Sequence, residues 1–239
     1  MHPVEQYLSD IGAIRATGAG TGETSYYTAL SVLLNEIGSK LSPKVRCVIQ
    51  LKDKGPGLPD GGMFTADQFK SKAAKAKENA DKTPLAFLPP TRGVIEVKSP
   101  AEDMPSIIAS EQIARYWDHY GLVLVTNYRI FTLIGRTPSG TPLELESFTL
   151  ADTEAAFWKL AAQPRTCPAV IRDRFAEYLY RVMIHNAPLT SPQDVAAHST
   201  PCNEKGTADI GGVGTAGGSV VGHGNTRGRR DRWKYSRIS

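Results

Sequence analysis

The feature that most constrains this sequence is a short strand-forming run at residues 93–98 that carries two opposite charges. The run has the sequence GVIEVK. Side chains two positions apart on a strand point to the same face, so Glu96 and Lys98 should emerge side by side. Burying a charged pair on an otherwise apolar strand is costly unless a partner compensates for the lost water. The run therefore indicates either a solvated strand face or a site that holds a cation with its bound water.

Hydrophobic periodicity around this run predicts the remaining elements. Apolar alternation and short apolar runs predict further strands at residues 44–51, 58–64, 122–126 and 129–134. Apolar residues at three- and four-residue steps predict helices at residues 23–37, 105–119, 151–162 and 168–185. This order predicts an α/β fold, in which helices flank a small mixed central sheet and further helices follow it.

Composition divides the chain into three predicted parts. Residues 1–135 are the predicted core, and residues 136–200 are a predicted helical extension or connector. Residues 201–239 are first rich in glycine and then polar and basic. Such a segment buries too little apolar surface to offset its ordering entropy, so we expect a disordered tail.

Charge and cysteine content limit the partners and the compartment. The chain has 239 residues and a formal net charge of +4, which permits a polyanionic partner without requiring one. Its three cysteines are scattered, which argues against a structural zinc site or a disulfide framework and favours a reducing cytoplasm. A signal pattern and an apolar run of about 18 residues are both missing from the sequence, so we expect no membrane association.

A second carboxylate precedes the charged strand. Asp60 follows Pro59 in the only Pro-Asp step of the chain. With Glu96 it would form a site of hard oxygen ligands, and Mg²⁺ prefers few carboxylates with several retained waters. The glycines at 61 and 62 equally fit a plain turn.

Three other side chains have both a structural and a functional interpretation. Gln112 and Tyr116 are four residues apart on a predicted helix and share one face, either within a site or on an ordinary helix surface. Glu23 opens the first predicted helix, where the helix dipole favours an acid, and it is also placed to be an outer metal ligand.

This ordered set resembles the PD-(D/E)xK nuclease superfamily. The matching residues are Glu23, Pro59, Asp60, Glu96, Val97, Lys98, Gln112 and Tyr116. More narrowly, residues 20–190 resemble the N-terminal nuclease region of restriction–modification polypeptides that also carry an adenine-specific DNA methyltransferase, and residues 188–196 resemble the junction with that methyltransferase. The chain departs from the pattern in its long lysine-rich insertion before Glu96 and in the missing methyltransferase motif.

The resemblance implies an endonuclease that hydrolyses phosphodiester bonds of DNA with Mg²⁺. Asp60 and Glu96, with the carbonyl of Val97 and with Glu23 further out, would bind the metal. Lys98 would orient or help deprotonate the attacking water, and Gln112 would hold Lys98 or a neighbouring phosphate.

The nucleic-acid contacts implied by the resemblance lie partly in the insertion. Tyr116 is one candidate, and four lysines form a candidate arm for sequence-independent phosphate contacts: Lys70, Lys72, Lys75 and Lys77. A solvated surface helix is the other interpretation of these lysines.

Two further possibilities concern cofactors and partners. The glycine-rich residues 18–22 lack the preceding apolar strand of a dinucleotide fingerprint, so we predict no cofactor site there. The alternative function is a catalytically silent N-terminal fragment, or a DNA-binding domain, of an adenine-specific DNA methyltransferase polypeptide, and the glycine-rich tail favours a fragment. A methyltransferase or specificity module encoded downstream would then be a partner.

Overall fold

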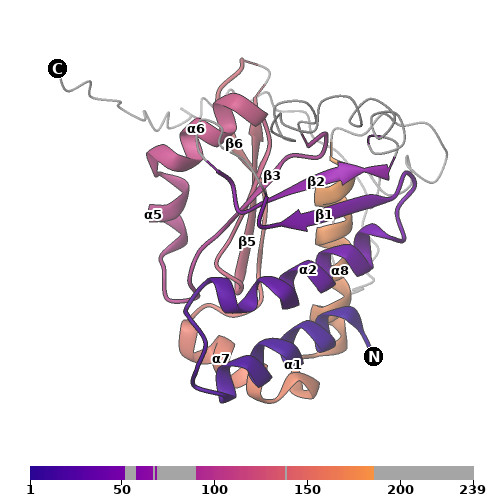
Figure 1. Cartoon of the computed structure of the whole chain (residues 1–239), viewed down its shortest axis with the longest axis vertical. Helices are drawn as coiled ribbons and strands as arrows, with labels where there is room; N and C mark the ends of the chain where they lie inside the picture. Colours follow the sequence, from indigo (N-terminus) through magenta and orange to yellow (C-terminus); the bar gives the residue numbers. More distant parts are fainter. Residues whose placement is uncertain (52–57, 67, 69–89, 138, 186–239) are drawn as a thin grey trace, which may run out of the picture. The chain divides into compact units, whose positions relative to one another are not determined.

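The computed structural model describes residues 1–51, 58–66, 68, 90–137 and 139–185 (Figure 1). All of them belong to one structural unit. Several predictions lie outside the described residues: the four lysines from Lys70 to Lys77, the end of the predicted extension at 186–200, the methyltransferase-like junction at 188–196, and the tail at 201–239.

The described residues form a six-stranded mixed sheet whose strands follow one another in chain order. The strands are β1 (Val45–Ile49), β2 (Gly61–Thr65), β3 (Val94–Val97), β4 (Val123–Thr126), β5 (Ile130–Arg136) and β6 (Pro142–Thr149). Neighbours are antiparallel except for β3 and β4, which are parallel. A parallel pair needs a crossover connection, and two helices between these strands supply it: α5 (Met104–Ile108) and α6 (Glu111–Tyr120).

Helices cover both faces of this sheet. On one face, α5 and α6 pack against the side chains of Val94, Val123 and Val125. On the other face lie α1 (Pro3–Ala16), η1 (Thr24–Tyr26), α2 (Tyr27–Gly38), α7 (Glu154–Ala162), η2 (Pro164–Thr166) and α8 (Ala169–Ile184) (Figure 1). The predicted α/β fold, a mixed central sheet flanked by helices, is confirmed.

The crossover differs from the single helix predicted over residues 105–119. The chain interrupts it near Ser110, whose hydroxyl accepts a hydrogen bond from the N–H of Ile113 and so caps a new helix. Asp103 caps α5 in the same way through Ser106. Gly121 ends α6 with φ of 75°, a left-handed conformation that glycine adopts at little cost.

Besides the short η2, one helix and one strand were not predicted. The helix α1 buries four side chains on one narrow stripe, Val4, Tyr7, Leu8 and Ile11, and its remaining residues are exposed or half-buried, so its periodicity is weak.

The second missed element is β6, which lies within the predicted helical extension. It is an edge strand with mostly exposed side chains, so it lacks the apolar run of a buried strand. The predicted core boundary at residue 135 falls inside β5, which pairs with β6 along its whole length.

Candidate functional site

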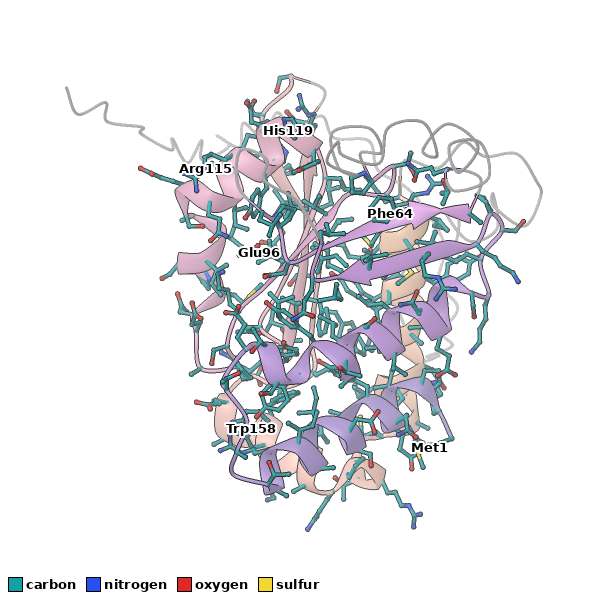
Figure 2. The ribbon with its side chains drawn as sticks, viewed as in Figure 1. Met1, Phe64, Glu96, Arg115, His119 and Trp158 are labelled. Carbon is teal, nitrogen blue, oxygen red and sulfur yellow. The ribbon has the colours of Figure 1, made fainter. Side chains whose placement is uncertain are left out.

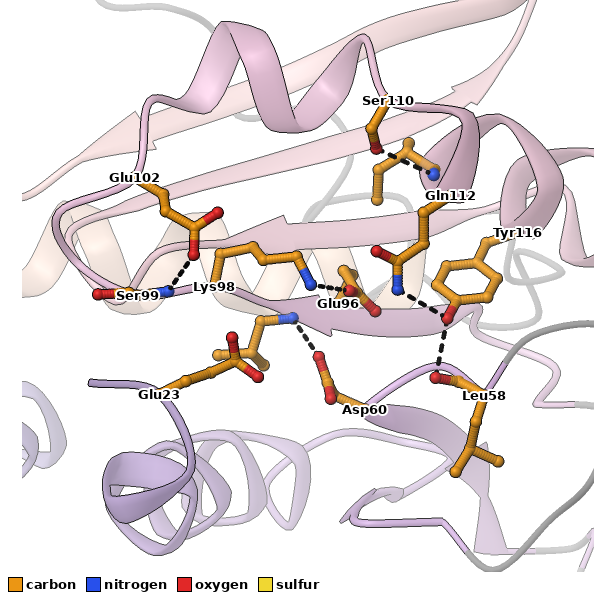
Figure 3. A network of polar contacts seen from close by, with 12 residues as sticks. Glu23, Leu58, Asp60, Glu96, Lys98, Ser99, Glu102, Ser110, Gln112 and Tyr116 are labelled. Atoms are coloured by element: carbon orange, nitrogen blue, oxygen red, sulfur yellow. Dashed lines mark hydrogen bonds and ion pairs between the residues drawn. The ribbon is translucent and has the colours of Figure 1, made fainter. Parts of the chain in front are cut away.

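The strand β3 sorts its side chains onto opposite faces, as the alternation predicted. Ile95 and Val97 enter the core beneath α1 and α2, whereas Glu96 and Lys98 point to the other face. The ammonium of Lys98 donates a charge-assisted hydrogen bond to Oε1 of Glu96 (Figure 3). The side chain of Glu96 is 1% exposed and that of Lys98 is 22% exposed, so the acid is buried beneath a partly accessible amine.

Asp60 lies immediately before β2 and reaches the same place. Because β2 pairs with β3, Oδ2 of Asp60 accepts a hydrogen bond of 2.8 Å from the N–H of Val97. Gly61 and Gly62 are residues of β2, so the interpretation of this segment as a plain turn was wrong. A Cβ on Gly61 would come within 2.8 Å of the carbonyl oxygen of Val48, which explains why glycine is needed in this close strand pairing.

Glu23 lies near Asp60, because one tyrosine hydroxyl contacts both carboxylates. It precedes η1, and its Oε1 lies 3.1 Å from the hydroxyl of Tyr27. The same hydroxyl donates to Oδ1 of Asp60 at 2.7 Å. Tyr27 was not predicted as a site residue. It lies within the predicted helix of residues 23–37, and its four-residue spacing from Glu23 was a usable signal.

The helix α6 contributes the remaining predicted side chains. Gln112 and Tyr116 share a face, as predicted, and the amide of Gln112 donates to the hydroxyl of Tyr116 at 3.0 Å. That hydroxyl donates in turn to the carbonyl of Leu58 at 2.8 Å. Tyr116 thus ties α6 to the segment that leads into Asp60 (Figure 3).

The electrostatics of the site are dominated by Glu96. Burial first, and then the negative charges of Asp60 and Glu23, raise the pKa of its carboxyl to about 7, against the opposite effect of Lys98. Burial lowers the pKa of Lys98, but the hydrogen bond to Glu96 and the surrounding acids outweigh burial and raise it. The amine is therefore held in its ammonium form.

The donor set fits a hard cation. Within the described part of the chain, Oε2 of Glu96 is buried and has no hydrogen-bond partner. Each oxygen of Asp60 accepts one hydrogen bond and keeps a second acceptor position. No cluster of three or more His, Cys, Asp or Glu suited to a metal ion occurs among these residues. Two carboxylates assisted by water and backbone carbonyls are a donor set that suits Mg²⁺.

Four groups therefore lie close together: the side chains of Asp60, Glu96 and Lys98, and the backbone of Val97. Glu23 lies beside Asp60. Figure 2 locates Glu96 below α6, the helix that carries Arg115 and His119. Gln112 and Tyr116 lie on α6 close to the acids. Burial raises the pKa of Tyr116, and the charges of Glu96 and Asp60 act in the same direction.

Comparisons with known proteins add little. No protein-family model and no curated protein matches this chain. One solved structure, described as a cryo-EM structure of a DrdV–DNA complex, aligns with a TM-score of 0.41 and 18% sequence identity, over 67% of this chain and 96% of that chain. A similarity of this size does not establish a shared function. The described helices are all too short or too polar to cross a lipid bilayer.

Proposed function

We propose that this protein is a Mg²⁺-dependent DNA endonuclease with an active site of the PD-(D/E)xK kind, acting within a restriction–modification system. The observation that carries the proposal is the meeting of Asp60 and Glu96, from neighbouring strands, with the ammonium of Lys98. The unpartnered buried oxygen of Glu96 supports it, because a cation would supply the missing partner.

In this proposal Asp60 and Glu96 hold the metal ion, with the carbonyl of Val97 as a further ligand. A bound Mg²⁺ polarises a phosphate oxygen and lowers the pKa of a coordinated water. The surrounding protein holds the two carboxylates in place beside neighbouring strands. Because Glu96 is buried, bulk water is kept away from its carboxylate.

Lys98 has the role of a fixed positive charge. Its raised pKa keeps the proton on Nζ, so it can donate a hydrogen bond to the attacking water or to a phosphate oxygen. A preorganised ammonium at this position offsets negative charge that develops on the phosphate during hydrolysis. Gln112 and Tyr116 hold the segment before Asp60 in place from α6.

The direct test is cleavage of supercoiled plasmid DNA with Mg²⁺ by the purified chain and its variants. We expect Asp60→Asn, Glu96→Gln and Lys98→Met each to lower the rate by about 100-fold or more, because each removes a group that stabilises developing charge. Matched controls are Asp118→Asn and Lys159→Met, which change the same residue types at exposed helical positions.

Two results would contradict the proposal. One is a cleavage rate that survives all three site substitutions, which would assign the activity to a contaminant. The other is wild-type protein that binds the plasmid and leaves it intact at all Mg²⁺ concentrations, which would favour a catalytically silent DNA-binding domain.

A further inference from the structure

Tyr27 places one hydroxyl between two acids of the site. It is the first residue of α2, and its ring is buried in the core cluster. Its hydroxyl lies 2.7 Å from Oδ1 of Asp60 and 3.1 Å from Oε1 of Glu23. A phenol has a single proton to donate. The shorter distance gives that proton to Asp60, while Glu23 remains within reach of the same group.

The second oxygen of Asp60 is also held. Its Oδ2 accepts the N–H of Val97 at 2.8 Å, so the carboxylate has one protein donor on each oxygen. These donors come from two different elements, α2 and β3, and together they fix the plane of the carboxylate. Without the hydroxyl of Tyr27, Asp60 could rotate about its side-chain bonds and turn toward the ammonium of Lys98.

The main chain of Glu23 is anchored separately. Its carbonyl accepts a hydrogen bond of 2.5 Å from the hydroxyl of Tyr128. Tyr128 has φ of 67°, a strained conformation for a residue with a side chain. Hydrogen bonds from Tyr7 and to Thr126 hold it there. Supported strain of this kind occurs most often at functional sites. The hydroxyl of Tyr27 therefore contacts the carboxylate of Glu23, a residue whose backbone is already fixed.

We infer that Tyr27 is a positioning residue, which orients Asp60 for cation binding and keeps Glu23 beside it as an outer acid. The inference rests on the proposed function, because it assigns Tyr27 a role in binding the catalytic cation. Hydrogen-bond partners of metal-binding carboxylates typically contribute roughly 10- to 100-fold to metal affinity or activity.

The test compares Tyr27→Phe with Tyr26→Phe. Both changes remove one hydroxyl and keep a buried ring. Tyr26 packs on the rings of Tyr128 and Trp158, and among the described residues its contact with the acids is the backbone N–H that donates to the carbonyl of Glu23, which the substitution leaves in place. Mg²⁺ affinity is measured by calorimetry without DNA, and the Mg²⁺ dependence of plasmid cleavage is measured in parallel. We expect Tyr27→Phe to weaken Mg²⁺ binding about tenfold or more. At saturating Mg²⁺ its cleavage rate should approach that of the wild type.

A third variant separates positioning from a general loss of structure. Because Tyr27 acts largely through Asp60, adding Tyr27→Phe to Asp60→Asn should weaken Mg²⁺ binding little further. Equal Mg²⁺ affinities for Tyr27→Phe, Tyr26→Phe and wild type would overturn the inference about Tyr27 and leave the proposed function standing. Equal losses in both phenylalanine variants would also overturn it, since a loss of folding would then explain them. Wild-type protein that neither binds Mg²⁺ nor cleaves DNA would overturn the proposed function, and the inference with it.

Discussion

Glu96 is a carboxylate in the middle of a sheet, and its burial has a measurable consequence at the scale of a single residue. The neighbouring side chains of β3 and β4 on its face are valines, which offer no hydrogen bonds. Lys98 satisfies one oxygen, and the other has no partner within the described residues. A buried acid that is only partly compensated favours its neutral form, which explains the direction of its pKa shift.

The first prediction concerns stability against pH without metal. The pKa of Glu96 is about 7 in the folded chain, against an ordinary value of 4.5. The folded state therefore binds more protons between these values, and the free energy of unfolding should fall as pH rises through this window. The expected fall is on the order of 1–3 kcal/mol. Urea unfolding at several pH values, with a chelator present, measures it.

Glu96→Gln should flatten this dependence, because the amide does not titrate. The exposed Glu177→Gln serves as the matched control and should keep the wild-type slope. If wild type and Glu96→Gln lose stability in parallel between pH 5 and 7.5, the slope comes from another group.

Residue identity alone predicted part of this site. Glu96 and Lys98 were predictable because strand alternation is local, and Asp60 because a second acid preceded a strand. For Tyr27 only the four-residue spacing from Glu23 was a local signal, because its hydroxyl also bonds to an acid 33 residues away. The left-handed backbone of Tyr128 was not predicted either, although the short connection between β4 and β5 favours a positive φ.

At the scale of elements, the edge strand β1 depends on a side chain of the adjacent helix. Asn35 on α2 donates its amide to the carbonyl of Cys47 at 2.8 Å and accepts the N–H of Cys47 at 3.0 Å. The N–H and C=O of Cys47 are thereby both hydrogen-bonded. On an edge strand such groups otherwise have no partner within the sheet. This link connects α2, which carries Tyr27, to the strand that pairs with β2.

Asn35→Ala should therefore weaken the join between α2 and β1. Both hydrogen bonds to Cys47 disappear, together with those that the amide donates to the carbonyl and hydroxyl of Ser31. The N–H and C=O of Cys47 then lose their partners, which costs about 1–3 kcal/mol. Chemical denaturation gives the value. Val32→Ala, at an exposed position of the same helix, is the control and should change stability little. Equal effects of the two substitutions would show that the amide contributes nothing specific.

Strands buried on both faces were predictable, whereas α1, with one narrow buried stripe, and the edge strand β6 were not. The strands β3, β4 and β5 appear in the sequence as apolar runs because both of their faces are covered. The edge strand β6 lacks such a run, but its alternation of leucine with glutamate is a strand signal that the predicted helical extension overlooked. The parallel pairing of β3 with β4 depends on the crossover helices, and no local residue encodes it.

At the scale of the whole described unit, the sheet depends on residues far along the chain. The face opposite α6 is covered in part by α7 and α8, which contribute Phe157, Phe175 and Tyr178 to the same core cluster as Phe131 of β5. The hydroxyl of Tyr178 donates to the carbonyl of Phe131 at 2.8 Å, inside the core. The helices after β6, α7 and α8, are therefore packed against the sheet that carries the acids.

The final prediction applies this packing to the predicted core of residues 1–135. A chain ending at Gly135 would lose β6 and would expose the apolar face that α7 and α8 cover. Burying apolar surface stabilises a fold by about 25 cal/mol per Å², and whole domains are stable by only about 5–15 kcal/mol. We expect residues 1–135 alone to show no cooperative thermal transition by circular dichroism, whereas the full chain shows one. A shortened chain that melts cooperatively and still binds Mg²⁺ would establish that the acids and their sheet form an independent core, with α7 and α8 as an added layer.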